Sequence, residues 1–168
     1  MSYKFIDLFC GAGGFTSGFS AAGIHSVISN DIEESACITL KSNHPEIETY
    51  CADICDENTK DYIVRRAIES GAEIVCGGPP CQGFSMAGFR DETDPRNQLF
   101  RDFIDVVNRV EPKVIVFENV QGIMTLKKGA IYKEILQLFN EIGYNLEARL
   151  LNFVNYGVPQ KRKRVVII

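Results

Sequence analysis

Short apolar runs alternate with amphipathic stretches along most of the chain, and the two patterns have different periods. The short runs predict strands at residues 4–9, 26–30, 48–51, 72–76, 113–117, 146–153 and 165–168. Apolar residues three or four positions apart predict helices at residues 17–22, 32–40, 58–70, 99–110 and 131–142. Strands and helices that alternate in this order predict an α/β fold with a doubly wound, mostly parallel sheet.

A glycine-rich loop, Gly11–Gly14, lies between the first predicted strand and the first predicted helix. Strand, glycine loop and helix in this order form the first unit of a nucleotide-binding α/β fold. The dinucleotide fingerprint requires a further glycine at position 16, where this chain has Thr16. The sequence therefore disfavours a hydride-transfer cofactor and leaves open another nucleoside that lies against the loop.

Aspartates follow the second and third predicted strands. Asp31 comes about 20 residues after the glycine loop, where an acidic side chain can accept hydrogen bonds from ribose hydroxyls. Asp31 and Glu34 also have the spacing of a capping box, so Asp31 is expected to cap the second helix as well. Asp53 is expected either to contact the same ligand or to be an ordinary turn residue.

Cys81 follows a segment of the chain that is expected to be rigid. The segment reads Gly77-Gly78-Pro79-Pro80-Cys81-Gln82-Gly83-Phe84-Ser85. Its glycines allow a sharp turn and its prolines stiffen the backbone beyond that turn. Ligands of open α/β sheets bind beyond the carboxyl ends of the strands, so Cys81 is a candidate nucleophile, with a structural cysteine as the alternative. Residues 83–97 show no periodicity, and a loop of this length predicts a functional lid.

Charged residues near the end of the chain provide a candidate acid and a candidate anion site. Glu118 follows the continuous apolar run 113–117, which is typical of a strand buried in a parallel sheet. A carboxyl group that leaves so apolar a strand tends to have a raised pKa and can hold a proton. A solvated glutamate at the start of a loop is the alternative. The run 161–164 (Lys-Arg-Lys-Arg) is the local basic patch that a polyanion partner would need in a chain of net charge −4.

Length and cysteine usage exclude several classes of protein. The 168 residues fit one domain with a sizeable core. No apolar segment approaches the roughly 20 residues that cross a bilayer, and the first residues, which lead directly into a predicted strand, are not expected to be a signal peptide. The six cysteines are therefore expected to be free thiols in the cytoplasm of a protein that is not secreted. The spacing of Cys51 and Cys55 matches no zinc motif, so no metal is expected.

Four blocks in a fixed order resemble one known family. They are residues 7–15 (Asp-Leu-Phe-Cys-Gly-Ala-Gly-Gly-Phe), 79–82 (Pro-Pro-Cys-Gln), 118–120 (Glu-Asn-Val) and 160–164 (Gln-Lys-Arg-Lys-Arg). In these blocks the chain resembles the cytosine-C5 DNA methyltransferases, and the resemblance covers essentially all of it. It implies the Rossmann-like fold of the S-adenosylmethionine-dependent methyltransferases. Asp31 stands where many members have glutamate, and Ile32 stands where some have an aromatic residue.

The resemblance implies that S-adenosylmethionine is the cofactor and that C5 of a cytosine in DNA receives the methyl group. Cys81 would add to C6 of the cytosine, and protonated Glu118 would donate to N3. Arg162 or Arg164 would hold O2. The cytosine would be flipped out of the duplex, because an enzyme cannot reach these atoms in a stacked base. The cofactor pocket would be lined by Phe9, Gly11, Gly14, Asp31, Ile32, Asp53, Ile54, Pro80 and Leu99.

The same resemblance implies partners. Members normally continue into a target-recognition domain and a last cofactor-contacting segment, which these 168 residues do not include. Residues 1–168 are therefore expected to be a truncated catalytic and cofactor-binding domain, inactive alone, whose partners are double-stranded DNA and a complementary C-terminal chain. The expected setting is bacterial or phage restriction–modification, in the cytoplasm or on the nucleoid and without a membrane. Two alternatives remain: an RNA (tRNA) cytosine-C5 methyltransferase, and a cofactor-binding half that needs a partner.

Overall fold

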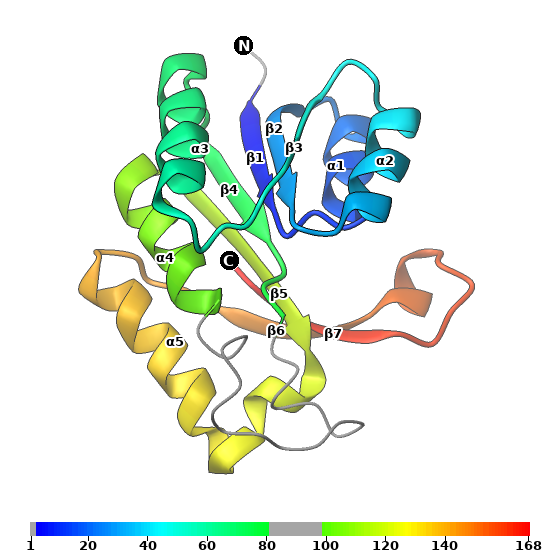
Figure 1. Cartoon of the computed structure of the whole chain (residues 1–168). Helices are drawn as coiled ribbons and strands as arrows, with labels where there is room; N and C mark the ends of the chain where they lie inside the picture. The colour runs from blue at the N-terminus through cyan, green and yellow to red at the C-terminus, as the bar shows by residue number, and fades with distance from the viewer. Residues whose placement is uncertain (1–2, 81–98) are drawn as a thin grey trace. The chain divides into compact units, whose positions relative to one another are not determined.

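The computed structural model describes residues 3–80 and 99–168 (Figure 1). The strands are β1 (Lys4–Leu8), β2 (His25–Asp31), β3 (Glu48–Cys51), β4 (Ile74–Gly77), β5 (Val114–Val120), β6 (Ala148–Asn152) and β7 (Lys163–Ile167). The helices are α1 (Gly14–Ala21), α2 (Glu34–Asn43), α3 (Glu57–Ser70), α4 (Leu99–Val110) and α5 (Ala130–Glu141). Short 3₁₀ turns are η3 (Gln121–Met124), η4 (Leu126–Gly129) and η5 (Phe153–Tyr156).

The strands form one sheet in the order β3-β2-β1-β4-β5-β7-β6. β1 is parallel to β2 and to β4, and β2 is parallel to β3. β7 runs antiparallel to both of its neighbours, β5 and β6. The sheet is therefore mostly parallel, as the alternation of strands and helices predicts.

The chain divides into two compact units. The first unit contains residues 1–78 and 105–116. In it, α1 and α2 cover one face of the parallel strands and α3 covers the other (Figure 1). Phe5, Ile6 and Leu8 of β1 are fully buried because both faces of this central strand are covered. Burial on both faces explains why β1 reads as a nearly continuous apolar run.

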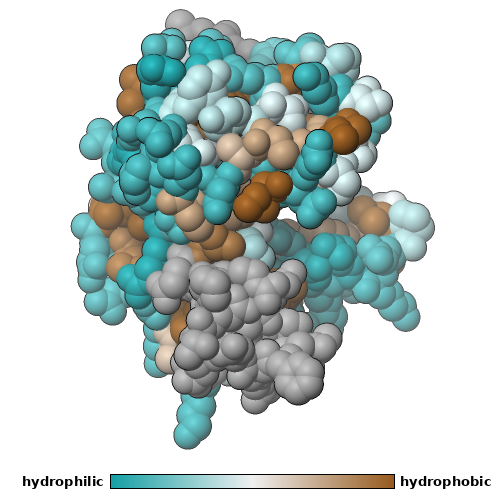
Figure 2. Space-filling model, viewed as in Figure 1, coloured by the Kyte–Doolittle hydropathy of each residue, from teal (hydrophilic) through white to brown (hydrophobic). Residues whose placement is uncertain are grey.

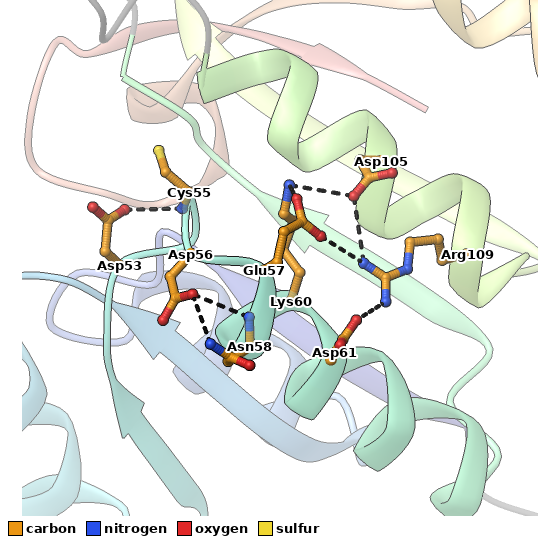
Figure 3. Close-up of polar contacts among 9 residues, drawn as sticks. All are labelled: Asp53, Cys55, Asp56, Glu57, Asn58, Lys60, Asp61, Asp105 and Arg109. Carbon is orange, nitrogen blue, oxygen red and sulfur yellow. Dashed lines mark hydrogen bonds and ion pairs between the residues drawn. The ribbon is translucent and has the colours of Figure 1, made fainter.

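Ion pairs join α3 to the second half of α4 within the first unit (Figure 3). The Lys60 ammonium lies 2.6 Å from a Glu57 carboxylate oxygen and 3.5 Å from one of Asp105. Arg109 pairs with the same Asp105 at 3.6 Å and also with Asp61. Lys60 is buried, and a buried ammonium is tolerated only with such carboxylate partners.

The second unit contains residues 79–104 and 117–168. Its core holds three mutually edge-to-face rings, which come from α4 (Phe103), β5 (Phe117) and α5 (Phe139). Their centroids lie 5.4 to 6.3 Å apart, within the range in which aromatic pairs attract. All three rings are fully buried, so they fix the position of β5 directly before Glu118.

The surface drawn in Figure 2 is mostly hydrophilic, with apolar residues in small separate groups. None of the helices in the described ranges combines the length and the apolar character that a membrane span requires.

One local prediction is wrong, and one of the alternatives is excluded. α2 has Glu33 as its N-cap, so Asp31 and Glu34 do not form a capping box, and Asp31 instead accepts from the Glu33 N–H. Glu118 does not begin a loop: β5 continues to Val120 because β7 pairs with its last four residues. Cys81 and the expected lid, residues 83–97, lie outside the described residues.

Candidate cofactor and catalytic sites

The glycine loop after β1 has an unusual backbone. Phe9, Gly11 and Gly13 all have positive φ angles, of 56°, 52° and 95°. At Gly13 a side chain is disfavoured twice: by the positive φ, and because a Cβ there would lie 2.5 Å from a methyl group of Leu40, which would have to move. A Cβ at Gly11 or Gly14 would meet nothing within 4 Å. The loop is therefore pressed against α2 at Gly13 and open at Gly11 and Gly14, where a ligand could approach the backbone.

Asp31 connects this loop to the turn after β2. One carboxylate oxygen accepts from the Gly11 N–H at 2.8 Å, and the other accepts from the Glu33 N–H at 2.9 Å. An ionised carboxylate has about four acceptor positions, so these two bonds leave acceptor capacity for a ligand. The next residue, Ile32, presents an apolar side chain that is 66% exposed.

Asn30 aligns the ends of β2 and β3, a role that the sequence analysis missed. It is 2% exposed, and its amide nitrogen donates to the carbonyls of Tyr50 and Ala52 at 2.9 and 3.0 Å. The Ala52 N–H in turn donates to the Asp31 carbonyl. An amide at the end of an apolar strand, directly before Asp31, was the available signal. Asp53 follows this junction.

Asp53 and Ile54 lie in the turn between β3 and α3. The Asp53 side chain is exposed, and one of its oxygens accepts from the Cys55 N–H at 2.9 Å (Figure 3). This bond is the turn role that the sequence analysis held as an alternative, and the other carboxylate oxygen is not engaged by it. Ile54 is buried.

Thr16 occupies the position where a dinucleotide fingerprint has glycine. It is fully buried, and both its N–H and its hydroxyl donate to one oxygen of Asp7, at 3.1 and 2.8 Å. The same hydroxyl lies 3.1 Å from the Ser29 hydroxyl of β2. Burial raises the pKa of Asp7 to about 7, although the bonds from Thr16 act in the opposite direction. A polar chain thus runs beneath the glycine loop.

The candidate catalytic residues of the second unit meet on β5 and β7. Arg164 Nε lies 2.7 Å from an oxygen of Glu118, and both side chains are mostly buried, at 18% and 23% exposed. Burial raises the pKa of Glu118, while the charges of Arg164 and Arg162 oppose that rise. Arg162 itself is exposed. The structure therefore brings Glu118 and Arg164 together and places Arg162 at the surface.

Asn119 holds the segment that leads toward Cys81. The sequence analysis also missed this role of Asn119. Its amide nitrogen donates to the Pro79 carbonyl at 2.9 Å, and its amide oxygen accepts from the Val120 N–H. Pro80 is partly buried at the end of the described range, and Leu99, also partly buried, begins α4. Both belong to the second unit.

No metal centre is found in residues 3–80 and 99–168, because no three His, Cys, Asp or Glu side chains there are placed to hold an ion.

Strand order, the reversed β7, the glycine loop and the aspartate after β2 define the Rossmann-like fold of the S-adenosylmethionine-dependent methyltransferases. The match is closer than the fold alone: a model of the C-5 cytosine-specific DNA methylases matches residues 3–168, and the chain belongs to this family. S-adenosylmethionine is accordingly its cofactor.

Relatives agree with this assignment. The type II methyltransferase M1.HphI of Haemophilus parahaemolyticus is 42% identical, over 100% of this chain and 46% of the relative. M.AquIA of Picosynechococcus sp. is 40% identical, over 100% of this chain and 72% of the relative. An Escherichia coli prophage protein, assigned as a DNA modification methyltransferase, superposes with a TM-score of 0.81 at 30% identity, over 99% of this chain and 46% of its own. The chain thus spans less than half the length of M1.HphI.

Proposed function

We propose that this protein transfers a methyl group from S-adenosylmethionine to C5 of a cytosine in DNA, through a covalent bond between Cys81 and C6. The observation that carries the proposal is the pairing of Glu118 with Arg164, a candidate acid and a cation held 2.7 Å apart and largely shielded from water. Family membership and the type II methyltransferase relatives support the same reaction.

The Glu118–Arg164 pair suits the two charges that the reaction develops. When the Cys81 thiolate adds to C6, electron density moves toward N3 and O2 of the ring. Glu118 donates a proton to N3, and Arg164 stabilises O2. We assign the O2 contact to Arg164 because Arg164 pairs directly with the Glu118 carboxyl group, whereas Arg162 is exposed.

The same pair also sets when Glu118 takes up its proton. In the free protein Arg164 stabilises the ionised carboxylate and so lowers its pKa. Once O2 of the cytosine accepts from Arg164, the carboxylate loses part of this stabilisation while its burial remains. Its pKa then rises, and the protonated form that donates to N3 becomes populated when the base is bound.

Residues of the first unit fit the nucleoside part of the cofactor. The acceptor capacity left on Asp31 suits ribose hydroxyls, and the exposed Ile32 side chain offers an apolar contact for adenine. Open space at Gly11 and Gly14 lets a ligand approach the loop. When bound, S-adenosylmethionine supplies the methyl group. Phe9, Asp53 and Ile54 complete the proposed set in this unit, and membership of the family is what supports Pro80 and Leu99 as further members.

A polyanionic substrate is supported by the connection from β6 to β7. This connection and the first two residues of β7 (residues 153–164) contain four basic residues and no acidic one, although the chain has a net charge of −4. Backbone bonds fold this connection on itself: the Phe153 N–H donates to the Arg162 carbonyl at 2.9 Å, and the Val158 N–H donates to the Phe153 carbonyl at 3.3 Å. Tyr156, in the same connection, is exposed. Cations and an exposed aromatic ring suit a nucleic-acid backbone and an unpaired base.

The test is methyl transfer from tritiated S-adenosylmethionine to genomic DNA and, in parallel, to tRNA. The chain is assayed alone and together with a polypeptide that supplies a recognition region, because we expect base readout to need a surface that enters a groove. We expect 5-methylcytosine in DNA only in the second case, and none with Cys81→Ser. Label in tRNA alone would replace DNA by RNA as the substrate. Cofactor binding without transfer to either nucleic acid, under both conditions, would contradict the proposal and favour a cofactor-binding subunit.

A further inference from the structure

Two thiols converge on the turn that carries Asp31. Cys37, in the first half of α2, donates from Sγ to the Asp31 carbonyl at 3.6 Å. Cys51, the last residue of β3, donates from Sγ to the next carbonyl, that of Ile32, at 3.8 Å. β2 and β3 also place Asp31 and Cys51 opposite each other in parallel register. The two sulfur atoms are therefore held against consecutive peptide units of one short turn.

The two thiols lie against neighbouring carbonyls of the same turn and differ in exposure. Burial is the largest cause of the raised pKa of Cys37, and its hydrogen bond with the Cys51 thiol is the next. Cys37 is 5% exposed, whereas Cys51 is open to solvent. Cys51 is thus the sulfur that an oxidant in solution reaches, and Cys37 is the partner that lies beside it.

We propose that Cys37 and Cys51 form a reversible disulfide when the protein meets a peroxide, and that this bond weakens the binding of S-adenosylmethionine. In the first step the Cys51 thiolate attacks hydrogen peroxide, which gives Cys51 sulfenic acid and hydroxide. In the second step the Cys37 sulfur attacks the sulfenic sulfur, which forms the S–S bond and releases water. A dithiol reductant reverses the change.

The weaker binding follows from the shortening of the sulfur–sulfur distance. A disulfide requires about 2.05 Å between sulfur atoms, whereas each sulfur now lies against its own carbonyl, Cys37 on Asp31 and Cys51 on Ile32. Both sulfurs must move toward each other, and both lose the protons that they donate to the Asp31 and Ile32 carbonyls. The turn between them also holds the Asp31 carboxylate against Gly11 and Glu33. The link to cofactor affinity rests on the proposed role of Asp31, whereas the disulfide itself does not.

The experiment uses the Cys81→Ser protein, so that the candidate nucleophile does not react. The protein is treated with hydrogen peroxide, remaining thiols are alkylated, and peptides are mapped by mass spectrometry. We then measure deuterium exchange at the Gly11 and Glu33 amides and titrate the protein with S-adenosylmethionine by calorimetry. Both measurements are made on the oxidised protein and repeated after reduction with dithiothreitol. Cys51→Ser is the variant that cannot form the disulfide. Cys55→Ser, which removes another exposed thiol, is the matched control.

We expect a peptide pair linked through Cys37 and Cys51, faster exchange at the two amides, and at least tenfold weaker cofactor binding that dithiothreitol restores. Cys51→Ser should show none of these changes, and Cys55→Ser should show all of them. Absence of the linked pair would overturn the disulfide. A linked pair with unchanged exchange and unchanged affinity would overturn its effect. A reduced protein that binds no cofactor would instead contradict the proposed function. The mass spectrometry and the deuterium exchange would still show whether the disulfide forms and whether it changes the turn.

Discussion

The amide nitrogen of Asn119 donates a hydrogen bond of 2.9 Å to the carbonyl oxygen of Pro79, two residues before Cys81. Both groups are buried, and the bond joins β5 to the segment that leads to the proposed nucleophile. Glu118, the proposed acid, is the neighbour of Asn119 on the same strand. β5 therefore carries the proposed acid and also holds the segment that leads to the proposed nucleophile.

Asn119→Ala should lower the rate of methyl transfer by at least tenfold, because the Pro79 segment loses its anchor and Cys81 is less well positioned. The KM for S-adenosylmethionine should change little. The lost buried bond should also cost about 1–3 kcal/mol in the free energy of unfolding. Steady-state kinetics and urea unfolding measure the two effects. Asn108→Ala, on the exposed side of α4, is the control; equal losses in both variants would exclude an anchoring role.

Glu118→Gln should slow methyl transfer by about 10²–10⁴-fold, the range typical of a general acid, while cofactor affinity stays unchanged. A loss of only a few-fold would show that Glu118 is not the acid. Calorimetry with S-adenosylmethionine and single-turnover kinetics separate these two quantities.

Arg162→Ala should move the alkaline limb of the pH–rate profile to higher pH. The positive charge of Arg162 lowers the pKa of Glu118, so its removal keeps Glu118 protonated to a higher pH. Arg149→Ala, an exposed arginine on β6, serves as the control and should leave the limb in place. An unchanged or acid-shifted limb in Arg162→Ala would contradict the assignment of that limb to Glu118.

Asp31→Asn should weaken S-adenosylmethionine binding by at least tenfold, because an amide has one acceptor oxygen where the carboxylate has two. The protein should also lose about 1 kcal/mol of stability, since only one of the Gly11 and Glu33 N–H groups keeps a good acceptor. Calorimetry and thermal unfolding measure the two effects. The control is Glu34→Gln in the same turn. If Asp31→Asn lowered the stability but left the affinity for S-adenosylmethionine unchanged, the role of Asp31 would be purely structural.

Asp7→Asn should change how stability depends on pH. The folded-state pKa of Asp7, about 7, lies above its ordinary value of 3.8, so folding favours the protonated form. The stability that this gives is present at low pH and is lost as pH rises toward and through 7. The wild type should therefore lose up to a few kcal/mol relative to Asp7→Asn between about pH 4 and about pH 7. Urea unfolding at several pH values measures this, and a constant difference would exclude Asp7 as the titrating group.

The sequence predicts the elements and the chemistry better than it predicts the contacts between them. The spacing of apolar residues and the positions of glycines locate most strands and helices, because both signals lie within each element or directly beside it. The extension of β5 through Glu118 depends on pairing with β7, more than 40 residues later, which no local pattern carries. Asn30 and Asn119 escape notice for the same reason: each bonds to backbone groups that only the folded sheet brings near. Asp31 shows the reverse case, in which a valid spacing for a cap is overridden by a bond to the glycine loop.

Thr16 bears on how a chain of this architecture could exchange one class of cofactor for another. Glycine at position 16 would complete the spacing of a dinucleotide fingerprint, yet it would remove the hydroxyl that bridges Asp7 and Ser29 beneath the loop. The buried carboxyl group of Asp7 would then lose the Thr16 hydroxyl as a donor, and Ser29 would keep only the Ser26 hydroxyl. Redesign toward a nicotinamide cofactor therefore has to begin beneath the loop, with an apolar or amide residue at position 7. Only then can glycine be introduced at position 16 without loss of stability. Positions 7, 16 and 29 form one hydrogen-bonded unit, and we expect them to change together or not at all.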